Sequence, residues 1–129
     1  MGKILTEISE AELLDKISIL EIKLKEIKDP DLLKQVDKEY KILINIKNDN
    51  LNLTKEVEDL FLKLKNTNTK IWQIENEKRL CEKNSSFGEK FIKLSRDEFY
   101  ANDERAKIKS KINNILNSNI KEVKQHTKY

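Results

Sequence analysis

Hydrophobic residues recur along most of the chain at alternating spacings of three and four, which is the period of an α-helix. The first such run begins after Ser9 and Glu12, which form a capping box, and continues to Ile27. Asp29 and Pro30 end this run and start the next, because Asp caps a helix and Pro fits its first turn. The pattern predicts helices over about 10–28, 31–48, 51–83 and 89–117, followed by a polar tail over 118–129.

The boundary between the second and third predicted helices is ambiguous. The Asn48-Asp49-Asn50 cluster favours a loop, but no Gly or Pro enforces it, and the apolar stripe continues through it in phase. A continuous helix over 31–83 is therefore an alternative. The segment Asn84-Ser85-Ser86-Phe87-Gly88 is the clearest turn in the chain. We expect an all-α, coiled-coil-like bundle, in which 51–83 and 89–117 form a long antiparallel hairpin and the two shorter helices pack on it.

Composition agrees with one helical domain over residues 1–129. The chain has only two Gly and one Pro, so it contains few residues that favour turns. Its 38% of charged residues suits long amphipathic helices. The single Cys81 lies on an apolar seam and excludes an internal disulfide, so nothing demands an oxidising compartment. No apolar signal segment precedes Glu7, and no apolar run reaches the roughly 20 residues that span a bilayer. We expect a cytoplasmic protein without a membrane span.

The C-terminal part of the chain is basic. From Arg105 to Tyr129 there are seven basic residues and one acidic residue, Glu122, a balance that suits a phosphate-rich or acidic partner. However, lysines at the end of a helix complement its dipole, and no aromatic residues interleave these lysines as stacking platforms would require. We therefore do not expect nucleic acid as the partner.

Charged residues occur where the helical pattern demands apolar ones. Glu98 and Arg105 lie on the apolar stripe of the last predicted helix, and an unpaired buried charge costs several kcal/mol, so each should have a partner. Arg105 is also one of three arginines, with Arg79 and Arg96, that fall within one short window of a lysine-rich chain. Arginine can hold a carboxylate or phosphate with two parallel hydrogen bonds, which lysine cannot.

Two polar stripes on the long hairpin predict a charged groove. If the chain turns near residue 85, Asn68 should lie near Asn102, Trp72 near Glu98, and Glu75 near Ser95 or Arg96. The candidate groove residues are Asn68, Trp72, Glu75, Arg79, Arg96, Glu98, Asn102, Arg105, Lys109 and Asn113. One interpretation is a set of ion pairs that fix helix register. The other is a cleft that binds an anionic ligand.

Catalytic signatures are weak. No Ser-His or Cys-His pair accompanies the acids, and the lone His126 lies near the chain end. The paired Glu-x-x-His motifs of di-metal bundles are missing, and Gly2 and Gly88 cannot form a phosphate loop. We therefore predict neither a metal nor a cofactor.

The chain resembles a family of short bacterial proteins that is catalogued as a domain of unknown function. Three longer segments match: Glu12–Lys23, Asn68–Glu75, which includes Trp72, and Asn102–Lys109, which is followed by Ile112-Asn113. The shorter matches are Phe87-Gly88 and the single residues Ser118, Glu122 and Lys124. The resemblance adds Asp15, Lys16 and Asp103 to the candidate site. It implies an accessory role in cell-envelope polysaccharide synthesis, because members tend to accompany its glycosyltransferases. Asn76 departs from the family pattern, which tends to have Asp there, and the tail after Lys124 is longer than usual.

These observations lead to three hypotheses. We expect a protein that binds an anionic small molecule or a protein partner through the groove, in a role accessory to envelope glycan synthesis. One alternative is a structural helical adaptor whose exposed seam docks a partner helix. A second copy of the chain could also bury the remaining apolar seam, which favours a homodimer. The other is a small helical enzyme that acts on a phosphorylated or carboxylated metabolite, with unknown catalytic residues.

Overall fold

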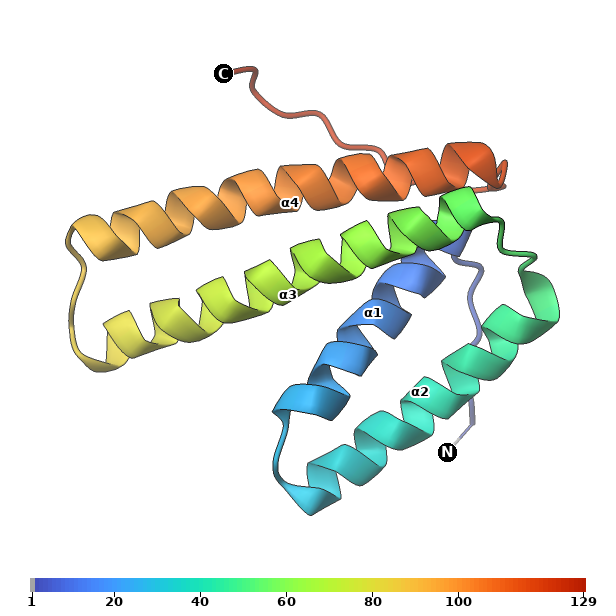
Figure 1. Cartoon of the computed structure of the whole chain (residues 1–129), viewed down its shortest axis with the longest axis horizontal. Helices are drawn as coiled ribbons and strands as arrows, with labels where there is room; N and C mark the ends of the chain where they lie inside the picture. The colour runs from blue at the N-terminus through green and yellow to red at the C-terminus, as the bar shows by residue number, and fades with distance from the viewer. Residues whose placement is uncertain (1) are drawn as a thin grey trace.

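The computed structural model describes residues 2–129 and confirms the all-α prediction (Figure 1). The four helices are α1 (Glu10–Glu26), α2 (Pro30–Asn50), α3 (Lys55–Lys83) and α4 (Glu89–Ile115). Helices α3 and α4 lie side by side as the predicted antiparallel hairpin. Helix α1 packs against the end of this hairpin opposite its turn, and α2 returns antiparallel to α1 (Figure 1).

Side-chain caps fix three of the helix starts. The Ser9 side chain accepts a hydrogen bond from the amide of Glu12, and the Asp29 carboxylate accepts from the first amides of α2. Thr54 accepts from the amide of Val57 at the start of α3. These caps satisfy backbone donors that have no partner within the helix.

Helices α3 and α4 end in the same backbone motif. The amides of Ser86 and Ser118 bond to carbonyls five residues earlier, at Cys81 and Asn113. This Schellman geometry needs a left-handed residue just before it, and Ser85 and Asn117 take that place, each with φ of 51°. Glycine usually occupies this position, so the sequence pattern alone indicated the turn but not its geometry.

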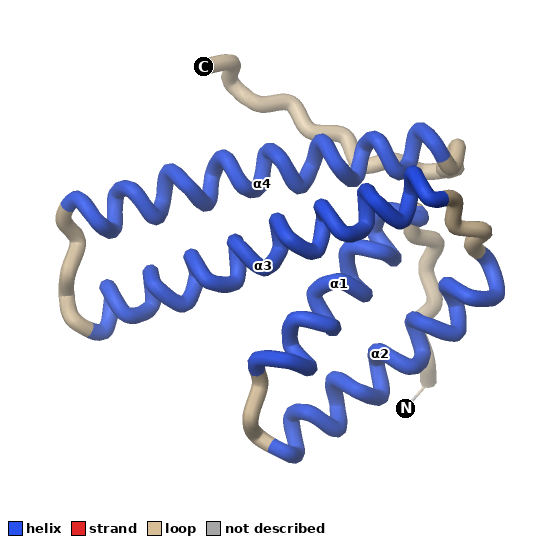
Figure 2. The backbone as a smooth tube through the Cα atoms, viewed as in Figure 1, coloured by secondary structure: helices blue, strands red, loops and turns tan. Residues whose placement is uncertain are grey.

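The second helix ends later than predicted. Asn48, Asp49 and Asn50 form the last turn of α2 instead of a loop, and the loop runs from Leu51 to Thr54 (Figure 2). The continuous helix over 31–83 is therefore wrong as well. Leu51 and Leu53 pack against the main hydrophobic core, and this anchoring places the four-residue break directly after the polar cluster.

Two hydrophobic clusters hold the bundle together. The main cluster lies where α1, α3 and α4 meet, and it contains Ala11, Leu14, Val57, Leu60, Leu64, Ile108 and Ile112. The smaller cluster lies between α3 and α4 near their turn and contains Ile74, Cys81 and Leu94. Cys81 is thus a buried core residue, as the sequence pattern indicated. Polar side chains occupy the interval between the two clusters.

Helix α2 contradicts the prediction that both short helices pack on the hairpin. It contacts α1 alone among the described helices, and it has no fully buried residue. Its polar link is the Tyr40 hydroxyl, which donates to Glu21 on α1 at 3.0 Å. No helix of the described chain is both long and apolar enough to cross a membrane.

Candidate functional site

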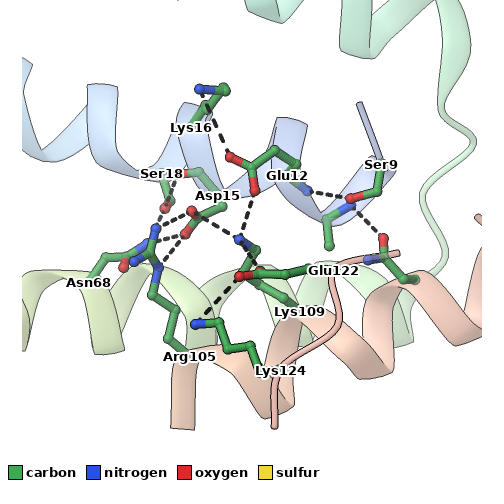
Figure 3. Close-up of polar contacts among 12 residues, drawn as sticks. Ser9, Glu12, Asp15, Lys16, Ser18, Asn68, Arg105, Lys109, Glu122 and Lys124 are labelled. Atoms are coloured by element: carbon green, nitrogen blue, oxygen red, sulfur yellow. Dashed lines mark hydrogen bonds and ion pairs between the residues drawn. The ribbon is translucent and has the colours of Figure 1, made fainter. Parts of the chain in front are cut away.

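Asp15 is the centre of the polar network that joins α1, α3 and α4 (Figure 3). Its side chain is 1% exposed. The Nε of Arg105 donates to Oδ1 of Asp15 at 3.0 Å, and Nη2 of Arg105 donates to Oδ2, which gives the two-bond fork expected of arginine. The amide of Asn68 donates to Oδ1 at 2.8 Å. Each of the three helices therefore supplies one member of this group.

Lys109 extends the network toward the N-terminus of α1. Its Nζ lies 2.8 Å from Glu12, 3.4 Å from Glu122 and 3.6 Å from Asp15, and its side chain is 10% exposed. Figure 3 shows its ammonium group between these carboxylates. Three acids around one buried cation leave little unbalanced positive charge at this point.

The pKa values of the network follow from these contacts. Burial alone would raise the pKa of Asp15, but hydrogen bonds from Arg105 and Asn68 and the nearby cations outweigh it, so this pKa lies below its usual value. Burial would lower the pKa of Lys109, and the surrounding carboxylates raise it above its usual value. The network is therefore ionised and internally compensated near neutral pH.

Asn68 and Asn113 form hydrogen bonds to backbone and hydroxyl groups around the network. Asn68 donates a second bond of 2.8 Å to the Ser18 hydroxyl, which itself donates to the Asp15 carbonyl. The Asn113 side chain accepts from the Ala11 amide and from the Ser118 hydroxyl, both at 2.9 Å. Because the Ala11 amide lies in the first turn of α1, Asn113 caps that helix from another element.

A second polar group lies nearer the hairpin turn. Lys78 Nζ is 2.8 Å from Glu98 and 5.6 Å from the centre of the Phe91 ring. A hydrogen bond between Glu75 and Glu98 raises the pKa of Glu75 and lowers that of Glu98. Glu98 therefore lies close to Lys78 and Glu75.

Both charges predicted to be on the buried face have partners. Arg105 pairs with Asp15 and Glu98 pairs with Lys78, as the desolvation cost required. These pairs support the interpretation that the charged stripes fix the packing of the helices.

A cavity of about 380 Å³ remains between α1 and α3, and Arg105 of α4 closes one side of it. Three isoleucines, among them Ile19 and Ile71, supply its apolar wall. Its polar lining includes Asn68, Trp72, Glu75, Asn76, Arg79 and Arg105. The cavity therefore contains five residues of the predicted groove.

Two cavity groups lack a partner. The indole Nε1 of Trp72 is buried and has no hydrogen-bond acceptor in the described chain. Arg79 is exposed and forms no ion pair with any of residues 2–129. A buried polar group without a partner is rare in folded proteins.

The remaining predicted residues lie outside this cavity. Lys16 is exposed and 3.9 Å from Glu12, and Arg96 lies on the exposed outer face of α4. Asp103 accepts a hydrogen bond from the Tyr129 hydroxyl. Asn102 is half-buried. The single groove of the prediction is thus divided into the Asp15 network, the Lys78–Glu98 pair and the α1–α3 cavity.

Several network members were not among the candidates. Ser18 lies within an apolar run, and the helical period does not distinguish it from an ordinary surface serine. Glu12 was assigned to helix capping, and it also binds Lys109. Glu122 had a visible signal, since it is the one acidic residue in a basic stretch. Among residues 2–129, no three His, Cys, Asp or Glu side chains converge in an arrangement that could hold a metal ion.

Comparison with known proteins gives a family without an assigned activity. The model described as "Family of unknown function (DUF6165)" matches residues 4–128, so the chain belongs to this family. The resemblance inferred from the motifs is confirmed at this level. No curated protein and no solved structure matches the chain.

Proposed function

We propose that the protein binds an anionic small molecule in the cavity between α1 and α3. The observation that carries this proposal is the presence, in one cavity, of an unpaired guanidinium at Arg79 and a buried indole donor without an acceptor at Trp72. A carboxylate or phosphate would accept from the Arg79 guanidinium, and from the Trp72 indole once that side chain turns its buried Nε1 into the cavity.

The rest of the lining suits an organic ligand. Ile19, Ile22 and Ile71 offer an apolar surface, and a volume of about 380 Å³ is in the range of small-molecule sites. Arg105 contributes less free charge than Arg79, because Asp15 already holds its fork.

Thermal unfolding with a panel of nucleotide sugars, sugar phosphates and dicarboxylates tests the proposal. A ligand at about 100 times its dissociation constant adds about 2.7 kcal/mol to the free energy of unfolding, which is several degrees for a domain of this size. Arg79→Gln should remove the shift with little loss of stability, because Arg79 is exposed and unpaired.

Arg96→Gln provides the matched control. It removes the same charge from the outer face of α4, away from the cavity lining, and should leave the ligand-induced shift unchanged. A shift that both variants retain, or a panel without any shift, would contradict a binding site at Arg79.

The pathway and compartment are part of the same proposal. The resemblance of the motifs to a bacterial family that accompanies glycosyltransferases supports an accessory role in cell-envelope glycan synthesis. We place this role in the cytoplasm, because the one cysteine is a buried free thiol that requires no oxidising environment.

A second candidate function is that of a helical adaptor. Ile92, Phe99 and Tyr100 are each half exposed or more, and they follow one face of α4 at the spacing with which a helix docks in a groove. This face has a hollow of about 460 Å³. We propose an amphipathic helix of another protein as its partner.

Capture of a partner from the native cell extract tests the adaptor. Phe99→Ser should abolish capture, whereas Phe87→Ser, at an equally exposed aromatic residue near the turn, should not. Equal capture by both variants would count against the α4 face.

A further inference from the structure

A second cavity, of about 370 Å³, lies between α4 and the C-terminal segment. Its lining includes four lysines, Lys107 and Lys109 on α4 and Lys121 and Lys124 on the segment. Lys107 and Lys121 form no ion pair within residues 2–129; Lys121 donates to the amide oxygen of Asn114 at 3.0 Å. This cavity accounts for much of the basic charge that the sequence concentrates near the C-terminus.

Glu122 supplies the one carboxylate of this lining. One of its oxygens is 3.4 Å from Lys109 and the other is 3.5 Å from Lys124. Charge-assisted hydrogen bonds are usually about 2.7–2.9 Å, so both contacts are loose. The Glu122 side chain is also 47% exposed, and it belongs to a segment without helix or strand. The carboxylate thus occupies a place that two cations share, and it is held weakly there.

We propose that this cavity binds a diphosphate group, which replaces the Glu122 carboxylate between Lys109 and Lys124. Lys107 and Lys121 then contact the outer oxygens, and the Ser110 hydroxyl in the lining can donate to the same group. No bond is made or broken; the step is an exchange of one anion for another.

The charge of the lining favours two phosphates over one. Once Glu122 is displaced, Lys107, Lys121 and Lys124 give a formal charge of +3, because Glu12 and Asp15 already balance Lys109. A phosphate monoester carries about −1.5 to −2 at neutral pH, which leaves positive charge unmatched, whereas a diphosphate balances the lining more closely. Part of the charge of Lys109 is already neutralised by Glu12 and Asp15, so the three exposed lysines carry most of the attraction.

Isothermal titration of the full chain with inorganic pyrophosphate tests the proposal. Lys121→Gln/Lys124→Gln should weaken binding by about tenfold or more, because two charged contacts are lost. The control Lys63→Gln/Lys70→Gln makes the same change of net charge at exposed positions of α3 and should bind like the wild type.

Glu122→Gln gives a result of opposite sign. Removal of the competing carboxylate should strengthen pyrophosphate binding, whereas a merely structural role for Glu122 would weaken it or leave it unchanged. Circular dichroism of each variant establishes that it is folded before the titration. Loss of binding in the control pair, unchanged binding in Lys121→Gln/Lys124→Gln, or no binding by the wild type would overturn the proposal.

The source of the diphosphate is distinguished by competition. Either ADP or phosphatidylcholine vesicles doped with diacylglycerol pyrophosphate should displace pyrophosphate; the more effective competitor identifies a soluble nucleotide or a lipid headgroup. Failure of both would overturn the diphosphate assignment. Arg79→Gln should leave pyrophosphate binding unchanged, because Arg79 lines the other cavity. The proposed anion site at Arg79 and the proposed diphosphate site are therefore tested independently of each other.

Discussion

The pair between Asp15 and Arg105 gives the most quantitative prediction. Arg105→Met removes both bonds of the fork and leaves the carboxylate of Asp15, which is 1% exposed, with Asn68 at 2.8 Å and Lys109 at 3.6 Å. Removal of one partner of a buried ion pair costs about 3–5 kcal/mol. The Arg105 side chain is 30% exposed and Lys109 compensates in part, so we expect about 3 kcal/mol.

Arg105→Lys separates charge from geometry. It keeps the positive charge and loses the planar fork, so the expected cost is smaller, about 1–2 kcal/mol. Combination of Arg105→Met with Asp15→Asn closes a double-mutant cycle. We expect a coupling energy of about 2 kcal/mol, because each single change leaves the other partner without its counter-charge.

Urea unfolding followed by circular dichroism measures these free energies. Each kcal/mol corresponds to roughly 3–5 °C in melting temperature for a domain of this length. Arg96→Met, at an exposed arginine of the same helix, should stay within about 0.5 kcal/mol of the wild type. A coupling energy below about 0.5 kcal/mol would refute the conclusion that this pair holds α1 on α4.

Three further predictions concern the turn, the acid stability and α2. Ser85→Gly should stabilise the protein by about 0.5–1 kcal/mol in urea unfolding, because residue 85 has φ of 51°, which glycine adopts without a steric penalty. The pKa of Asp15 lies below its usual 3.8, so its stabilising effect is present above about pH 4 and is lost as the pH falls further; the urea midpoint of Asp15→Asn should depend less on pH in this range. Amides of α2 should exchange with deuterium faster than those of α3, because α2 has no buried residue and packs on α1 alone; equal protection would contradict this.

Helix positions could be predicted well because their signals are local. The Ser9 cap, the Asp29-Pro30 junction and the Asn84–Gly88 turn each lie within a few residues of the boundary they set. The start of α3 is different, because Leu51 and Leu53 hold the loop against residues of other helices. Such a tertiary contact leaves no periodic signal in the sequence.

The candidate site was predicted only in part for a related reason. Periodicity showed that Arg105 needs a partner, but the partner, Asp15, lies 90 residues away on α1. In the same way the partner of Glu98, Lys78, lies 20 residues away on α3. The separation of the ion pairs from the cavity at Trp72 depends on where α1 crosses α3, which the sequence pattern does not specify.

Fluorescence of Trp72 during a titration with anionic metabolites is the most direct test of the proposed site. Trp72 is the one tryptophan of the chain and it lines the cavity, so a bound anion should change its emission. We expect a saturable change with at least one carboxylate or phosphate ligand, lost in Arg79→Gln and kept in Arg96→Gln. No change across the panel, or the same titration curve in both variants, would contradict an anion site in this cavity.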